Sequence, residues 1–165
     1  MIYINPDSFL GQPRIWSPER NKAAWEQCYL ALSSAVAERA IEGLYIVFGL
    51  QGAGKTHWIR TSSKGIVREP AAVFDAALPA ARHRARAIEI AGSGNIPVFA
   101  IWMDTPLSVA LARNASRPED ERVPREAIES VGELLEAPTF QEGFSEIYRI
   151  DPRGDILSHA RDART

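Results

Sequence analysis

The stretch from Gly49 to Thr56 constrains the fold most, because it reads Gly-Leu-Gln-Gly-Ala-Gly-Lys-Thr. It fits the phosphate-binding spacing of Gly, four residues and Gly-Lys-Thr without a mismatch. An apolar, β-rich run at 44–48 precedes it, and residues 57–60 can continue a helix that begins near Gly54. Strand, glycine loop and helix are the context that this motif requires. The sequence therefore predicts a site for a nucleoside triphosphate.

The residue types in this loop suit phosphate chemistry. Small residues let backbone N–H groups approach phosphate oxygens without a side chain in the way. Lys55 is expected to reach the β- and γ-phosphates, and the Thr56 hydroxyl is expected to bind Mg²⁺. The cofactors are then ATP and Mg²⁺. The loop residues expected at the nucleotide are Gly49, Gly52, Ala53, Gly54, Lys55 and Thr56.

Length and charge narrow the possible functions. The 165 residues are enough for one domain, 1–165, with a substantial core. The net charge of −2 argues against a surface that coats nucleic acid, so any nucleic acid must be held by a local patch. The single cysteine, Cys28, cannot form an internal disulfide. The sequence has neither a signal peptide nor an apolar run that could span a membrane, which predicts a cytoplasmic location and no membrane partner.

Strand patterns alternate with helical patterns along the chain. The expected strands are 1–4, 44–48, 71–75, 96–102 and 146–150, and the expected helices are 17–43, 54–62, 79–91, 105–114 and 124–135. This order predicts an α/β fold of the P-loop NTPase type, a three-layer sandwich with a five-stranded parallel sheet. Residues 151–165 read as a polar, partly helical tail.

Aspartates lie at or shortly after the ends of three of the expected strands, at positions 7, 75 and 104. Parallel strands bring their carboxyl ends to one edge of the sheet, where ligands bind. One carboxylate there can orient or deprotonate an acceptor hydroxyl, and another can hold Mg²⁺. We assign the first role to Asp7 and the second to Asp75, with turn formation as the alternative for both. Asp104, which precedes Thr-Pro and a helix, reads better as a cap or turn residue.

Arginines concentrate in two segments. Residues 113–135 carry four of them and could form a lid in which guanidinium groups close on the triphosphate. Three acidic residues at 119–121 support the alternative of a solvated, salt-bridged loop. In the second segment, Arg82 is a candidate for substrate contact, and at least one arginine is expected to be solvated. The arginines are Arg113, Arg117, Arg122 and Arg125 in the first segment, and Arg82, Arg84 and Arg86 in the second.

Four stretches of the chain resemble the P-loop polynucleotide 5′-kinase family and the related zeta-toxin-like kinases. They are Met103-Asp104-Thr105-Pro106-Leu107, Arg113-Asn114-Ala115-Ser116-Arg117-Pro118, Arg122-Val123-Pro124, and the segment 136–144, which ends in Glu-Gly-Phe. In that family two lid arginines lie four residues apart after a Thr-Pro-like turn. The resemblance therefore implies that Arg113 and Arg117 bind the nucleotide and stabilise the transition state.

The chain departs from the family in the order of its parts. The family's base-bearing strand follows the P-loop helix, whereas here only a short loop separates that helix from the strand ending at Asp75. The segment Tyr3-Ile4-Asn5-Pro6-Asp7-Ser8-Phe9 resembles that strand moved to the N-terminus. We therefore expect residues 1–43 to form the base-bearing module, with Asp7 as general base, and 44–62 to form the P-loop unit.

Two local substitutions accompany this change. The family's third-strand aspartate is usually followed by Thr-Asn, but Asp75 is followed by Ala76 and Ala77. The family also carries an arginine shortly after the base aspartate to grip the acceptor phosphate. Position 10 is leucine, so Arg14 is the candidate substitute.

The leading interpretation is a kinase that moves the γ-phosphate of ATP to a hydroxyl, with the 5′-OH of RNA or DNA as the expected acceptor. A P-loop kinase of a small molecule, such as a nucleoside, sugar or antibiotic, is the first alternative. A nucleotide-binding switch or regulatory ATPase is the second. The sequence does not determine the oligomeric state.

Overall fold

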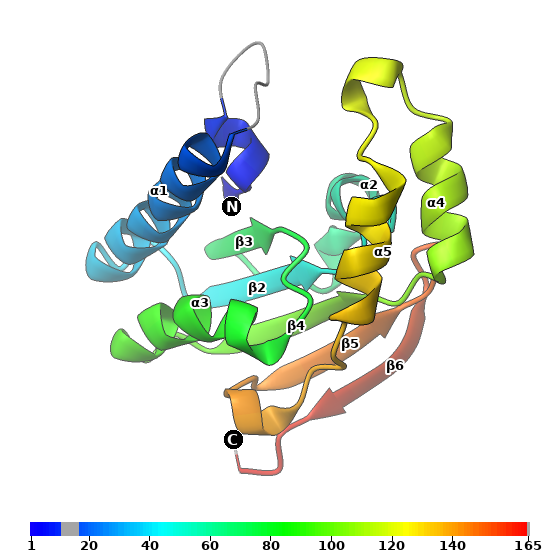
Figure 1. Cartoon of the computed structure of the whole chain (residues 1–165). Helices are drawn as coiled ribbons and strands as arrows, with labels where there is room; N and C mark the ends of the chain where they lie inside the picture. Colours follow the sequence, from blue (N-terminus) through cyan, green and yellow to red (C-terminus); the bar gives the residue numbers. More distant parts are fainter. Residues whose placement is uncertain (11–16, 165) are drawn as a thin grey trace.

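A computed structural model describes residues 1–10 and 17–164 (Figure 1). Its six strands form one sheet in the order β1-β3-β2-β4-β5-β6. The strands are β1 (Ile2–Ile4), β2 (Gly43–Phe48), β3 (Ala71–Asp75), β4 (Val98–Met103), β5 (Glu146–Ile150) and β6 (Ile156–Arg161). The helices are α1 (Pro18–Ala37), α2 (Lys55–Thr61), α3 (Ala81–Ser93), α4 (Leu107–Ala115) and α5 (Arg125–Glu133). Four short 3₁₀ turns are η1 (Pro6–Phe9), η2 (Ser63–Gly65), η3 (Glu119–Glu121) and η4 (Phe140–Glu142).

The first five strands are parallel, as the alternation of strand and helix patterns predicts. β2, which leads into the glycine loop, lies in the middle of the sheet, and all six of its residues are buried. β1 forms one edge, where Tyr3 lies opposite Val73 of β3. The N-terminal segment and the glycine loop therefore share one sheet.

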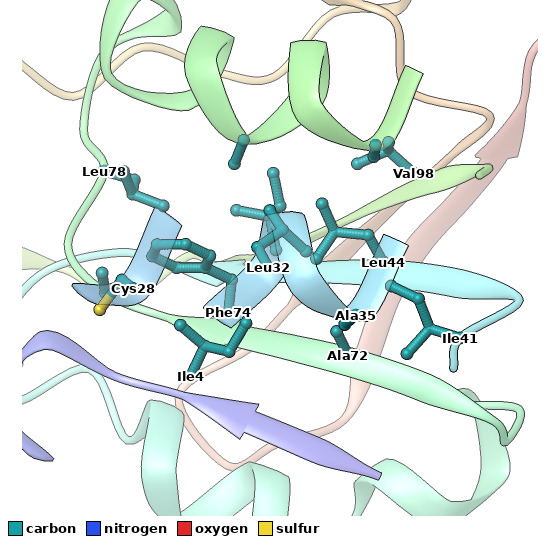
Figure 2. Close-up of a cluster of buried hydrophobic side chains, with 14 of the residues drawn as sticks. Ile4, Cys28, Leu32, Ala35, Ile41, Leu44, Ala72, Phe74, Leu78 and Val98 are labelled. Carbon is teal, nitrogen blue, oxygen red and sulfur yellow. The ribbon is translucent and has the colours of Figure 1, made fainter. Parts of the chain in front are cut away.

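Two helical layers cover the sheet. On one face, α1 and α3 bury a cluster that includes Leu32, Phe74 and Val98 (Figure 2). On the other face, a second cluster joins Trp58 of α2, Ala110 of α4 and Ile128 of α5 to residues of the central strands. The structure thus has the three layers that the sequence predicts.

Local signals explain where the main helices begin. Ser17 adopts an extended conformation and its Oγ accepts the backbone N–H of Arg20, while Pro18 occupies the first turn of α1. Gly54, with φ of 95°, immediately precedes α2. Within the described ranges, no helix has both the length and the apolar character needed to cross a bilayer.

The prediction for the C-terminal segment is wrong. Instead of a partly helical tail, residues 156–161 form β6, which pairs antiparallel with β5 and makes the sheet six-stranded rather than five-stranded and fully parallel. The carboxylate of Glu146 on β5 helps to hold this strand, because His159 Nε2 lies 2.6 Å and Arg161 Nε 3.5 Å from its oxygens. The hydroxyl of Tyr148 donates a third contact to the same carboxylate at 2.7 Å.

Helix limits also differ from the expectation. The first long helix ends at Ala37, well before Gly43, and Gly43 instead opens β2. The predicted lid, 113–135, comprises the end of α4, the η3 turn and α5. In Figure 1 the connection between α4 and α5 extends away from the sheet.

Candidate functional site

The glycine loop lies at the carboxyl end of β2, against α4 and the end of β4. A side chain at Gly49 would place its Cβ 2.7 Å from the carbonyl oxygen of Met103, and one at Gly52 would collide with the carbonyl oxygen of Ala110. Both glycines also have positive φ, 144° and 86°. Only glycine fits this close approach of loop and neighbouring backbone.

Lys55 is folded over the loop. Its ammonium donates to the carbonyl oxygens of Gly49, at 3.0 Å, and Leu50, at 2.9 Å. Removal from solvent lowers the pKa of Lys55, while the nearby carboxylate of Asp75 raises it. Arg117 lowers the same pKa further and Asp7 raises it to a smaller degree. The fold thus brings Asp7, Asp75 and Arg117 within electrostatic range of the loop lysine.

Thr56 and Asp75 are in direct contact. The Thr56 hydroxyl donates to Asp75 Oδ2 at 2.9 Å, and Asp75 is almost fully buried at the end of β3. A hydroxyl that gives its proton to a carboxylate leaves its lone pairs available for a cation. Hydroxyl, carboxylate, phosphate and water oxygens are the ligands that Mg²⁺ takes in nucleotide sites. The donors present therefore fit Mg²⁺ held with a nucleotide.

No all-protein metal cage occurs within residues 1–10 and 17–164, where groups of three or more histidine, cysteine or acidic ligands are absent.

Asp7 lies in the η1 turn that follows β1, with its side chain exposed. Its backbone N–H donates to Asn5 Oδ1 at 2.8 Å, which fixes the turn. Its charge helps to raise the pKa of Lys55, and it also helps to raise the pKa of the buried Cys28 thiol to about 12, an effect due mainly to desolvation. Asp7 therefore lies at the same sheet edge as the glycine loop, in a turn that also contacts α1.

Arg113 and Arg117 occupy different positions. Arg113 Nη1 donates to the carbonyl oxygen of Ala53 at 3.3 Å, and its Nη2 donates to that of Pro152 at 2.5 Å. It is therefore fixed against the loop rather than extended from the lid. Arg117 comes after α4, and within the described chain its guanidinium makes no hydrogen bond.

The remaining predicted residues divide into three cases. Arg82 is exposed near the start of α3 and has no ion pair within the described ranges. Arg14 lies outside the residues that the structure describes. Asp104 forms an ion pair with Arg149, and Arg149 Nε donates to Asp104 Oδ2 at 2.7 Å. Asp104 therefore links the end of β4 to β5.

A pocket of about 390 Å³ begins at the glycine loop and ends at the turn between β5 and β6. Arg113 lies between these two parts, and the buried ring of Trp58 forms part of the wall. The volume suits a small ligand. A larger hollow, lined by Arg39, Glu42 and Asn95 among others, lies at the opposite ends of the strands and away from the P-loop. The pocket walls include His57, Trp58, Met103, Arg113, Pro152 and Arg153.

Three features of this region do not follow from the sequence patterns. The turn at Pro152–Gly154 was assigned to a tail, although Pro, Gly and Asp there are ordinary turn signals. Tyr3 and Asn5, which contact Asp75, carry no motif of their own. Arg84 belongs to a run in which at least one arginine is expected to be solvated, and the sequence gives no sign that Arg84 itself is completely buried.

Comparison with known proteins adds one result. Residues 63–138 match the family model described as an AAA domain. The matched segment begins after the glycine loop and includes β3, α3, β4, α4 and α5, so the match and the loop motif are separate observations. No curated protein matches the chain.

The match and the mostly parallel six-stranded sheet point to the same fold. The match and the sheet fit a P-loop NTPase fold. This supports a nucleotide-binding function of the P-loop kinase or NTPase type, and such domains generally bind their nucleotide with Mg²⁺.

Proposed function

We propose that this protein is a Mg²⁺-dependent kinase that transfers the γ-phosphate of ATP to the 5′-hydroxyl of a polynucleotide. The observation that carries the proposal is that the carboxyl ends of β1, β3 and β2 meet at one sheet edge, which brings Asp7 and Asp75 within electrostatic range of Lys55. A nucleotide-binding switch needs the loop and the metal ligands. A carboxylate on the acceptor side is an additional requirement of a kinase.

Each residue has a definite role in this proposal. The loop amides and Lys55 hold the phosphates, and Thr56 and Asp75 would hold Mg²⁺, which would supply charge neutralisation at the phosphates. The exposed carboxylate of Asp7 accepts the proton of the attacking hydroxyl. Arg117, which makes no hydrogen bond within the described chain, is free to bind the transferring phosphate.

Arg113 has a different role, because its guanidinium already lines the pocket beside the loop. We place the nucleoside of ATP in this pocket, between Arg113 and the turn at Pro152–Gly154. The planar guanidinium can stack on a base while its donors hold the loop backbone.

The second candidate is a small-molecule kinase of the same fold. Leu10, at the position where the resembling family carries an arginine for the acceptor phosphate, is buried in the core. The net charge of −2 also gives little general attraction for a polyanion. An acceptor without a phosphate next to its hydroxyl would not need the missing arginine.

Transfer of label from γ-labelled ATP tests the proposal. The acceptors are 5′-OH RNA, 5′-OH DNA and a panel of nucleosides, sugars and aminoglycosides, each with Mg²⁺. Label on an oligonucleotide that is lost in both Lys55→Ala and Asp7→Asn is the expected result. Asp104→Asn is the matched control, because Asp104 lies at the same sheet edge but is paired with Arg149.

The other outcomes are equally informative. If Asp7→Asn still transferred label, the result would support the kinase activity but contradict the role of Asp7 as general base. Label on a small molecule alone would select the second candidate. ATP hydrolysis without any labelled acceptor would replace the kinase with a regulatory ATPase.

A further inference from the structure

The carboxylate of Asp75 is held by more than its partner in the P-loop. Besides the Thr56 hydroxyl, Asp75 Oδ2 accepts the Tyr3 hydroxyl at 2.7 Å and the Asn5 side-chain amide at 3.3 Å. All three donors converge on one oxygen. The other oxygen, Oδ1, has no hydrogen bond within residues 1–10 and 17–164.

The register of the sheet explains how Tyr3 reaches this carboxylate. Tyr3 lies opposite Val73, and successive side chains of a strand point to opposite faces. Asp75 is two residues beyond Val73 and so lies on the same face as Tyr3, one step further along. A tyrosine is long enough to span that diagonal. Ala76 and Ala77, which follow Asp75, have no polar side chain to make the contact instead.

Asn5 links two parts of the candidate site. Its Nδ2 donates to the Tyr3 hydroxyl at 2.9 Å and to Asp75 at 3.3 Å, while its Oδ1 accepts the backbone N–H of Asp7 at 2.8 Å. One amide therefore joins the carboxylate beside Thr56 to the turn that carries Asp7. Both the nitrogen and the oxygen of its side-chain amide take part in this bridge.

We propose that Tyr3 and Asn5 are positioning residues for the Mg²⁺ site, acting through Asp75. Their donors fix one carboxylate oxygen and leave the other free for the cation or for a water bound to it. Because both donors are neutral, they orient the carboxylate without competing with Mg²⁺ by charge. Partners that orient a ligand in this way are worth roughly 10- to 100-fold in metal affinity.

This inference rests on the nucleotide and Mg²⁺ site of the proposed function, and it does not depend on the acceptor. The test is therefore binding, not transfer. Binding of a fluorescent ATP analogue is titrated with Mg²⁺ in the full chain, and in parallel with EDTA, for the wild type, Tyr3→Phe and Asn5→Asp.

Tyr3→Phe removes one donor from a half-exposed ring and keeps its packing. Asn5→Asp keeps an acceptor for the Asp7 N–H but turns a second carboxylate toward Asp75. We expect the half-saturating Mg²⁺ concentration to rise about tenfold in Tyr3→Phe and further in Asn5→Asp. Nucleotide binding in EDTA should remain unchanged. Tyr29→Phe is the matched control, because the Tyr29 hydroxyl makes no hydrogen bond within the described chain.

An unchanged Mg²⁺ requirement in both variants would overturn the inference. An equal loss of binding in EDTA would also overturn it, since the two residues would then support only the loop. If the wild type bound the ATP analogue equally well with and without Mg²⁺, this would contradict the metal site itself. A shift in Mg²⁺ requirement in a protein that labels no acceptor would support the inference and contradict the kinase.

Discussion

Removing the carboxylate of Glu142 should destabilise the fold severely, although Glu142 lies in a short turn before β5. Its two oxygens accept Nε of Arg84 at 2.7 Å and Nη2 at 2.9 Å. The Arg84 side chain is completely buried, and that of Glu142 is only 9% exposed. In Glu142→Ala, two buried donors of a permanent cation therefore lose their partners.

The size of the effect follows from what remains around Arg84. Breaking a buried ion pair by removing one partner costs about 3–5 kcal/mol. Here Nη1 keeps the carbonyl oxygens of Leu78, Pro79 and Glu136 at 3.0–3.3 Å, and the guanidinium stays over the Phe48 ring. We therefore expect the lower end of that range, about 3 kcal/mol. For a chain of this length that is a fall in Tm of about 6–12 °C.

The same helix provides the control. Arg86, two residues along α3, makes an equally short bidentate pair with Glu26, but both of those side chains are about half exposed. In thermal unfolding, the Tm of Glu142→Ala should be far lower than that of Glu26→Ala. The Tm of Glu142→Gln should lie between them, because the amide keeps one acceptor. Equal melting temperatures for Glu142→Ala and Glu26→Ala would refute the reasoning that burial sets the cost.

Three further perturbations test the site and the sheet edge. Because Gly52 has a positive φ, Gly52→Ala should lower the free energy of unfolding by at least about 1–2 kcal/mol, as measured by thermal unfolding. It should also weaken ATP binding about tenfold or more, as measured by calorimetry. Unchanged stability and affinity would contradict the close packing of the loop. Arg113→Ala should lower ATP affinity roughly tenfold, whereas Arg125→Ala, in the exposed part of the lid, should not. Equal effects of the two substitutions would contradict a role of Arg113 in binding the nucleotide. Burial raises the pKa of Glu146, but its hydrogen bonds outweigh that effect and hold the pKa below the ordinary 4.5. The stabilisation from ionised Glu146 is complete above about pH 4.5 and is lost as pH falls through the lower folded-state pKa. Glu146→Gln should therefore flatten the acid side of a plot of Tm against pH. An unaltered plot would contradict this.

The glycine loop and the layers could be predicted because their signals are local. The loop requires particular residue types at fixed spacing, and β2 is an uninterrupted apolar run, as a strand buried on both faces must be. The order of strand and helix patterns then requires parallel pairing.

The strand β6 could not be predicted in the same way. All six of its residues are exposed, and Ile156-Leu157-Ser158-His159-Ala160-Arg161 shows no alternation of apolar and polar residues. Its conformation depends on the open edge of β5 and on the Glu146 carboxylate, which lies ten or more residues away in sequence. Pairing of this kind leaves no periodic pattern in the strand that it stabilises.

The candidate site shows the same division between local and non-local information. The roles of Lys55 and Thr56 are predictions from spacing alone, and that of Asp75 is a prediction from its place at a strand end. Tyr3 reaches Asp75 across 72 positions of sequence, and only the register of β1 against β3 brings the two together. A one-residue slip of β1 would turn Tyr3 to the opposite face. The sequence could therefore indicate which residues are expected to hold the phosphates and the metal, but not which residues contact Asp75.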